Sequence, residues 1–212
     1  MLHLETQNIS EETQRKISDF LAKVSGAPSR ALLLDYDGTL APFAADRQRA
    51  APYPEIPALL DRIRNLTNTR LVVVTGRSAP EIAALLGLKN IEVWGDHGLS
   101  RLHADGRYER PNLDHETLGK ISESGELLRQ AGLLDLLEFK PAAIAVHWRG
   151  MEAAADEVAR EVEKVWSTLH DRQGLELVRF DGGMEIRVAG RNKGDAVRII
   201  LAEMGGHPGI AY

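Results

Sequence analysis

The sequence predicts an α/β protein with a parallel-sheet core, an inserted α+β cap domain and a core truncated at its C-terminus. Three observations lead to this prediction. Short apolar runs alternate with amphipathic stretches between residues 31 and 94, hairpin-like segments follow, and a helix and a strand close the chain. Alternating strand and helix patterns are typical of a parallel sheet with helices on its faces.

The core elements follow from apolar periodicity. Ser10 is a candidate N-cap for a helix to residue 24, with an apolar stripe through Ile17, Phe20, Leu21 and Val24. Continuous apolar runs predict strands that are buried on both faces. The expected strands are 31–34, 71–74 and 91–94, and the expected helices between them are 56–66 and 80–86.

The pattern changes after residue 98. Segments 99–102 and 107–110 flank Ala-Asp-Gly and predict a hairpin. Helices are expected at 114–130 and 152–169, and strands at 136–139, 142–148, 175–180 and 184–188. We therefore expect a core over 1–104, a cap over 105–189 and a second core part over 190–212, with hinges near 103–106 and 189–191. A helix at 193–204 and a strand from Gly209 to Tyr212 complete the pattern.

Composition excludes several classes of function. The chain has 212 residues, of which 43% are hydrophobic and 27% charged, and a net charge of -5, so nothing favours nucleic acid or an anionic membrane as a partner. The absence of cysteine excludes disulfides and thiolate chemistry. The N-terminus is too polar for a secretory signal, and no apolar run approaches the roughly 18 residues of a membrane span. A cytoplasmic protein is the expectation.

The stretch LLLDYDGTL places Asp35 and Asp37 directly after a buried strand. In an open parallel sheet, ligands bind beyond the carboxyl ends of the strands. Two carboxylates so close together repel each other unless a cation or a shared proton intervenes, and oxygen ligands suit Mg²⁺. Asp35 could then attack phosphorus while Asp37 exchanges a proton with the leaving group. Taken alone, this stretch fits an Asx turn equally well.

Two other segments favour chemistry over a turn. LVVVTGR places Thr75 at the end of the second strand, where its hydroxyl could bind a phosphoryl oxygen, with Arg77 two residues on. RNKGDAV places Lys193 at the start of a helix. A cation there opposes the helix dipole unless an anion lies nearby. A nucleophile, a hydroxyl donor and a lysine clamp suit phosphoryl transfer, which depends on positioning and charge stabilisation.

The ordered segments DYDGT, VVVTGR and NKGDAV resemble the first three motifs of the haloacid dehalogenase superfamily of Mg²⁺-dependent phosphatases. LDYDGTLAPF, VWGDHGL, AVHWR and GMEIR resemble more narrowly the trehalose-6-phosphate phosphatases of that superfamily. The resemblance covers residues 30 to 212. It implies a Rossmann-like core and hydrolysis of trehalose 6-phosphate, and it leaves a functional link to a sugar-phosphate synthase open.

The resemblance also implies roles for single residues. Asp35 would be the nucleophile that forms an aspartyl-phosphate, and Asp37 the general acid and base, with Mg²⁺ bound at Asp35 and at the Asp37 carbonyl. Thr75 and Lys193 would hold the phosphate. Three features depart from the family: Asp96 stands where asparagine is usual, no acidic fourth motif follows the last strand, and Val188-Ala189 replaces the usual Val-Pro. We expect the second feature to reflect a fragment of a longer enzyme, because a core strand would otherwise end as an uncovered edge.

Sugar recognition is expected in the cap. His147 and Arg149 share one side of a predicted strand, as do Glu185 and Arg187, because alternate residues point to one face. The pattern alone favours a solvated face with cross-strand salt bridges. The resemblance favours substrate contact, above all for Glu185 and Arg149.

Other candidates and readings stay open. His97 is equally a substrate contact or a turn residue, and Arg77 is a candidate for binding the phosphate. Lys140 is a weak candidate, and Asn192 fits a helix cap. Phosphatases for sucrose phosphate or a glycosyl-phosphoglycerate, and a non-catalytic sugar-phosphate-binding module, are the competing readings.

Overall fold

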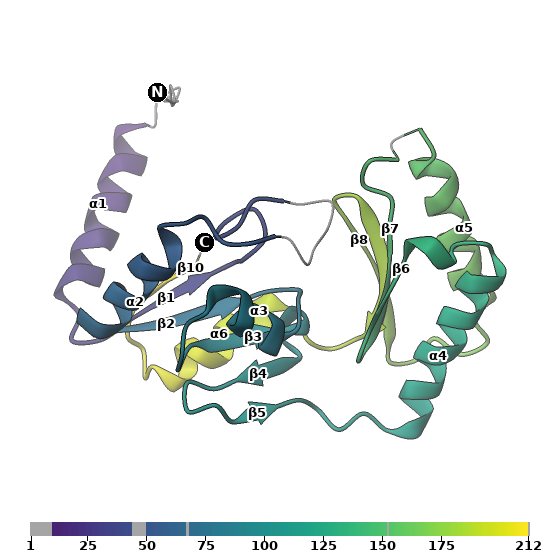
Figure 1. Cartoon of the computed structure of the whole chain (residues 1–212). Helices are drawn as coiled ribbons and strands as arrows, with labels where there is room; N and C mark the ends of the chain where they lie inside the picture. The colour runs from purple at the N-terminus through teal and green to yellow at the C-terminus, as the bar shows by residue number, and fades with distance from the viewer. Residues whose placement is uncertain (1–9, 44–49, 67, 152, 212) are drawn as a thin grey trace.

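The computed structural model describes residues 10–43, 50–66, 68–151 and 153–211 of the chain. It contains a six-stranded and a four-stranded sheet, which lie beside each other in Figure 1. We call residues 115–188, which form the four-stranded sheet and its helices, the insert, and the other described residues the core. No helix in these described ranges is long and apolar enough to cross a membrane.

The core sheet is mostly parallel, and the strand that precedes Asp35 lies next to its edge strand β10 (Gly209–Ala211). Strand β1 (Arg30–Leu34) lies between β10 and β2 (Thr69–Val74), and β3 (Glu92–Gly95) follows β2 in the same direction. Strands β4 (Ser100–Leu102) and β5 (Tyr108–Glu109) add to β3 in antiparallel fashion. The predicted α/β class with a largely parallel sheet is confirmed.

Helices cover both faces of this sheet, as the double-sided burial of its strands requires. Helices α2 (Ile56–Leu66) and α3 (Ala79–Leu86) pack on the face that carries Val73, through Leu60 and Ile82. Helix α6 (Lys193–Glu203) packs on the opposite face through Ile200, which contacts the cluster around Val72. Neighbouring residues of β2, such as Val72 and Val73, therefore pack in different apolar clusters, one on each face of the sheet.

Helix α1 (Glu11–Gly26) begins where the sequence predicts. The Ser10 hydroxyl accepts a hydrogen bond from the Thr13 amide and caps the helix. Val24 is the buried member of its apolar stripe, whereas Ile17, Phe20 and Leu21 remain exposed.

The insert is an α+β unit with one apolar and one polar sheet face. Its antiparallel strands follow the order β6 (Leu137–Lys140), β7 (Ala143–His147), β9 (Gly183–Val188) and β8 (Leu175–Phe180). Helices α4 (His115–Gln130) and α5 (Ala155–Thr168) pack on one face, with Leu128 and Val162 in a cluster that includes Ile144 and Ile186. Figure 1 shows these helices on the side of the sheet away from the core. The other face therefore points toward the core.

Two expectations about boundaries were wrong. Residues 105–110 belong to the core, because β5 pairs with β4. The turn at 103–106 is consequently a hairpin turn inside the core sheet and not a hinge, and the chain enters the insert at 110–114 instead. The hinge at 189–191 stays a prediction. Glu152 and Tyr212, at the ends of an expected helix and strand, lie outside the described residues.

The packing of the insert predicts how much stability is lost when a side chain of its apolar cluster is shortened. Leu128→Ala removes a fully buried side chain and should lower the free energy of unfolding by about 2–5 kcal/mol. Leu134→Ala is the matched control, because Leu134 is 52% exposed and should change stability by about 0.5 kcal/mol or less. Urea unfolding followed by circular dichroism measures both values, and equal losses would contradict the described packing.

Candidate active site

The loop after β1 is closed by its own backbone. The Tyr36 carbonyl accepts hydrogen bonds from the amides of Thr39, Leu40 and Ala41, at 3.2, 2.9 and 3.0 Å. Gly38 adopts φ = 79°, a conformation that costs glycine nothing. The buried Tyr36 hydroxyl donates to the Ala50 carbonyl at 2.7 Å. These contacts fix the backbone that presents Asp35 and Asp37 at the carboxyl end of β1.

Asp35 is paired with the lysine that the sequence places far along the chain. Lys193 Nζ donates to Asp35 Oδ2 at 2.6 Å, and the Tyr36 amide donates to Asp35 Oδ1 at 2.7 Å. Lys193 opens α6, where Asn192 and Asp195 form a capping box. The helix-cap interpretation of Asn192 is thus confirmed, and the cap fixes the position from which Lys193 reaches the carboxylate.

Asp37 is held by Arg77, not left free beside Asp35. Arg77 Nε donates to Asp37 Oδ2 at 2.9 Å, and Arg77 Nη2 donates to Asp37 Oδ1 at 2.8 Å. Burial disfavours the charged guanidinium, but hydrogen bonds with Asp37 and Glu81 outweigh it, so the pKa of Arg77 is raised. The Arg77 side chain is only 1% exposed and pairs with both Asp37 and Glu81, so it orients Asp37. Its contact with a substrate phosphate stays a prediction.

Thr75 stands at the end of β2, as predicted. Its side chain is fully buried, and its Oγ1 accepts a hydrogen bond from the Arg77 amide at 3.1 Å. Thr75 thereby shapes the turn from which the Arg77 side chain reaches Asp37. Its contact with a phosphate stays a prediction.

The turn after β3, at residues 96–98, is hydrogen-bonded to the turn after β2, at residues 75–77. Asp96 and His97 both adopt left-handed conformations, with φ = 51° and 56°. The Asp96 amide donates to the Arg77 carbonyl, and the His97 amide donates to the Thr75 carbonyl, at 2.8 and 2.9 Å. A Cβ on Gly95 would lie 2.4 Å from the Ala79 amide nitrogen, so only glycine allows this close approach. Strain of this kind persists only where surrounding contacts hold it, and it often marks functional sites.

Burial perturbs both side chains of this turn. Burial lowers the pKa of His97 from its ordinary value of 6.5 to about 4, although the nearby Glu185 opposes the shift. His97 is therefore a neutral imidazole near pH 7. Burial also raises the pKa of Asp96, against a hydrogen bond from the Ser100 hydroxyl.

A cavity of about 550 Å³ lies between the carboxyl ends of the core strands and the polar face of the insert. This volume falls within the range of about 300–1,000 Å³ typical of ligand sites. The core contributes Asp35, Asp37, Phe43, Gly76, His97 and Lys193 to its lining, and the insert contributes Glu138, Lys140, His147, Arg149, Phe180, Asp181 and Glu185, together with Asp135, Leu136 and Leu137. Asp35, Asp37, Lys193, His97, Arg149 and Glu185 thus lie around one cavity, as the sequence led us to expect.

The insert wall carries a network of charged groups. Glu185 is only 2% exposed, and it accepts a hydrogen bond from Lys140 and lies 3.6 Å from His97 Nε2. Glu138 lies 2.7 Å from His147 Nε2. A buried carboxylate with cationic and neutral donors around it is suited to binding sugar hydroxyls.

Sequence reasoning missed Glu138 and undervalued Lys140. Both project from β6 on the face opposite to Leu137 and Phe139, so the alternation of L-E-F-K carried the signal. By contrast, Arg187 donates to Glu176 at 2.7 Å, and the two residues are register partners in β9 and β8. This is a cross-strand salt bridge, as the pattern of alternate residues alone favours. Arg187 Nη1 also lies 3.8 Å from Glu185 Oε1, although Arg187 does not itself line the larger cavity.

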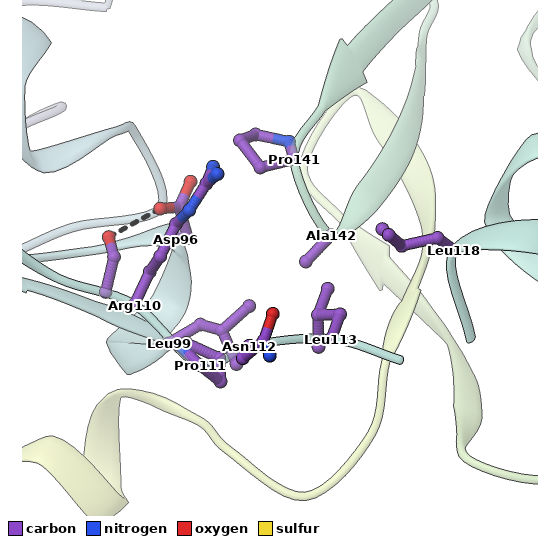
Figure 2. A pocket seen from close by; sticks show the side chains of 10 residues that line it. Asp96, Leu99, Arg110, Pro111, Asn112, Leu113, Leu118, Pro141 and Ala142 are labelled. Carbon is purple, nitrogen blue, oxygen red and sulfur yellow. Dashed lines mark hydrogen bonds between the residues drawn. The ribbon is translucent and has the colours of Figure 1, made fainter. Parts of the chain in front are cut away.

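A second, smaller cavity of about 230 Å³ lies at the junction of core and insert (Figure 2). Asp96 and Arg110 line it from the core, and Pro141 and Ala142 line it from the insert. Asp96 therefore contributes to the wall of the junction and not to the lining of the larger cavity.

The donors around Asp35 are hard oxygens, which fit Mg²⁺ in kind. Mg²⁺ usually keeps several waters and takes only one or two protein carboxylates. Among the described residues, no group of three or more His, Cys, Asp or Glu side chains forms a denser metal site. The donors that the resemblance implies, the Asp35 carboxylate and the Asp37 carbonyl, are oxygens of this kind, and their binding of Mg²⁺ stays a prediction.

Comparison with known proteins agrees with this geometry. A family model described as trehalose-phosphatase matches residues 33–211 of the chain. The chain belongs to the trehalose-phosphatase family. The match includes the end of β1, all of β2 and α6, which carry the residues around Asp35, and the whole insert.

Relatives with assigned names share this segment. A probable trehalose-phosphate phosphatase of Sinorhizobium fredii is 33% identical over 204 residues, covering 94% of this chain and 74% of that protein. A bifunctional trehalose-6-phosphate synthase/phosphatase of Thermoproteus tenax is 30% identical over 187 residues, covering 84% of this chain. The chain spans only 25% of the Thermoproteus protein.

The fold has a solved counterpart. The C-terminal domain of Candida albicans trehalose-6-phosphate phosphatase superposes with a TM-score of 0.74 and 20% identity, covering 87% of this chain and 66% of that one. The trehalose-phosphatase fold of core and insert is therefore shared across a large sequence distance.

The lowered pKa of His97 predicts a pH dependence of stability. The unfolded chain binds more protons than the folded one between pH 4 and 6.5, so the stability that His97 contributes is present above 6.5 and lost as the pH falls toward 4. His97→Asn, which tolerates the left-handed conformation, should flatten this decline by up to about 1.4 kcal/mol per pH unit. Urea unfolding from pH 7 to 4 measures it, and parallel curves for both proteins would refute the assignment.

Proposed function

We propose that this chain hydrolyses trehalose 6-phosphate to trehalose and phosphate through an aspartyl-phosphate on Asp35. The observation that carries the proposal is the convergence of Asp35, Asp37 and Lys193 on the cavity that the polar face of the insert closes. Family membership supports the substrate, since the related proteins carry names that refer to trehalose phosphate.

Asp35 is the nucleophile. Its carboxylate attacks phosphorus, and the bond from phosphorus to the sugar oxygen O6 breaks. Lys193 Nζ, at 2.6 Å from Asp35 Oδ2 without substrate, is positioned to stabilise the phosphoryl oxygens once the phosphate enters. Thr75 directly follows β2, and its hydroxyl would donate to a phosphoryl oxygen.

Asp37 is the general acid of the first step and the general base of the second. It donates a proton to O6 as trehalose leaves, and then accepts one from the water that attacks the aspartyl-phosphate. That water takes the phosphoryl group from Asp35 and restores the free carboxylate. The two hydrogen bonds from Arg77 fix the orientation of the ionised Asp37 carboxylate, the form that accepts the proton from water.

Mg²⁺ would be held by the Asp35 carboxylate and the Asp37 carbonyl. When bound, it supplies positive charge that offsets the repulsion between a carboxylate and a phosphate dianion. The surrounding residues have separate roles. Tyr36 and Gly38 fix the loop after β1, and Lys193 binds the phosphate of the substrate.

The insert acts as a cap that recognises the sugar. Glu138, Lys140 and Glu185 offer charged hydrogen-bonding groups to hydroxyls, and neutral His97 donates or accepts at the rim. A functional link to a synthase belongs to the same proposal, because one relative is named as both synthase and phosphatase.

The test is phosphate release from a panel of substrates by the full natural polypeptide that carries this sequence. The panel contains trehalose 6-phosphate, sucrose 6-phosphate, a glucosyl-phosphoglycerate and an aryl phosphate, each with Mg²⁺ or with EDTA. We expect Mg²⁺-dependent release that is selective for trehalose 6-phosphate. Asp35→Asn should lower it by a factor on the order of 10³ or more, whereas the surface control Asp156→Asn should not.

Two other results would redirect the proposal. Selective release from another sugar phosphate would retain the chemistry and replace the substrate. No release from any member of the panel would leave a sugar-phosphate-binding module, which calorimetric titration with trehalose 6-phosphate would detect.

The role of Arg77 gives a separate prediction. Arg77→Lys cannot make both hydrogen bonds to Asp37, so kcat should fall by about 10- to 100-fold with little change in KM. Arg70→Lys is the matched control, because Arg70 makes the same paired contact with Glu92 at the other end of β2, at 2.9 and 2.8 Å. Steady-state kinetics separates the two variants, and a purely KM-based effect of Arg77→Lys would contradict an orienting role.

A further inference from the structure

Phe43 is an aromatic side chain placed against the catalytic loop. It is 61% exposed, which is unusual for phenylalanine, and it lines the large cavity. A Cβ on Gly38 would lie 2.5 Å from Phe43 Cε2, so the ring rests directly on the backbone between Asp37 and Thr39. The ring is therefore fixed on one side by the loop that carries the nucleophile.

The insert contacts the same ring. The Arg149 guanidinium lies 4.8 Å from the centroid of Phe43, within the range of a cation–π interaction. Arg149 Nη2 also donates to the carbonyl and the carboxylate of Asp181, each at 2.9 Å. A continuous stack thus runs from Gly38 through Phe43 and Arg149 to the turn between β8 and β9.

This stack joins the two walls of the cavity. Phe43 comes from the core, while Arg149 and Asp181 come from the insert, and all three line the cavity. An arginine side chain has many rotamers, and holding it in one of them costs conformational entropy. The Phe43 ring and Asp181 restrain Arg149 from two sides before any ligand enters.

We infer that Phe43 is a positioning residue that holds Arg149 toward the substrate and ties the insert to the catalytic loop. The inference rests on the proposed function and deepens it, since it assigns a task to a residue outside the three motifs. Phe43 contributes no reacting atom. Its effect passes through Arg149, so it should influence substrate capture more than the chemical step.

Kinetic comparison of substitutions at Phe43 separates the effect of the aromatic ring from that of side-chain size. Phe43→Ala should raise KM for trehalose 6-phosphate by about 3- to 30-fold, the range expected for loss of a cation–π contact, with a smaller change in kcat. Phe43→Tyr should restore the KM, whereas Phe43→Leu should not. Tyr108→Ala, on β5 at the far edge of the core sheet, is the control for loss of an exposed aromatic side chain.

A double-mutant cycle identifies Arg149 as the partner. In an Arg149→Ala background, Phe43→Ala should add little to the increase in KM, because the interaction is already absent. Additive effects of the two substitutions would overturn the inference, as would equal behaviour of Phe43→Leu and Phe43→Tyr.

A distance measurement tests the same contact without activity. The chain contains no cysteine, so single cysteines at the exposed positions Lys89 and Glu163 allow specific spin labelling of core and insert. The distribution of distances between the labels should broaden in Phe43→Ala and recover in Phe43→Tyr. An unchanged distribution in Phe43→Ala would refute the link between core and insert, whatever substrate the enzyme uses. Failure of wild-type protein to release phosphate would instead count against the proposed function alone.

Discussion

The site depends on the ion pair between Asp35 and Lys193, which brings together the first and last segments of the core. Lys193 opens a helix, where a cation is unfavourable unless an anion lies nearby. Asp35 is that anion here, and the phosphate of a substrate would be a second one. Because β1 is flanked by β10 and β2, and α6 packs on this sheet through Ile200, the pair joins two segments that lie far apart in the sequence and meet in the folded core.

Around this pair, each core turn supports the next. Tyr36 closes the loop that holds Asp35 and Asp37, Thr75 shapes the turn from which Arg77 reaches Asp37, and the turn after β3 donates backbone hydrogen bonds to both Thr75 and Arg77. The insert then places its polar sheet face opposite these turns. In the proposed function, the core supplies the reacting groups and the insert recognises the sugar.

The sequence predicted those features of the fold and the site that follow from apolar periodicity and from the positions where strands end. Asp35 follows a strand and Lys193 opens a helix whose directions follow from the parallel sheet, so their meeting could be expected. The direction of the Arg77 side chain could not, because it depends on the buried space between Asp37 and Glu81. Glu138 was overlooked because four residues of strand give only a faint alternation, and the pKa of His97 depends on burial that no local pattern encodes.

The most direct test of the account is chemical trapping of the phosphorylated protein. Trehalose 6-phosphate labelled at phosphorus is mixed rapidly with the protein, quenched in acid, and the digest is sequenced by mass spectrometry. The account predicts label on the Asp35 carboxylate of the wild-type protein and no label on Asp35→Asn. Phosphate released with no protein-bound label, or with label on another residue, would contradict Asp35 as the nucleophile.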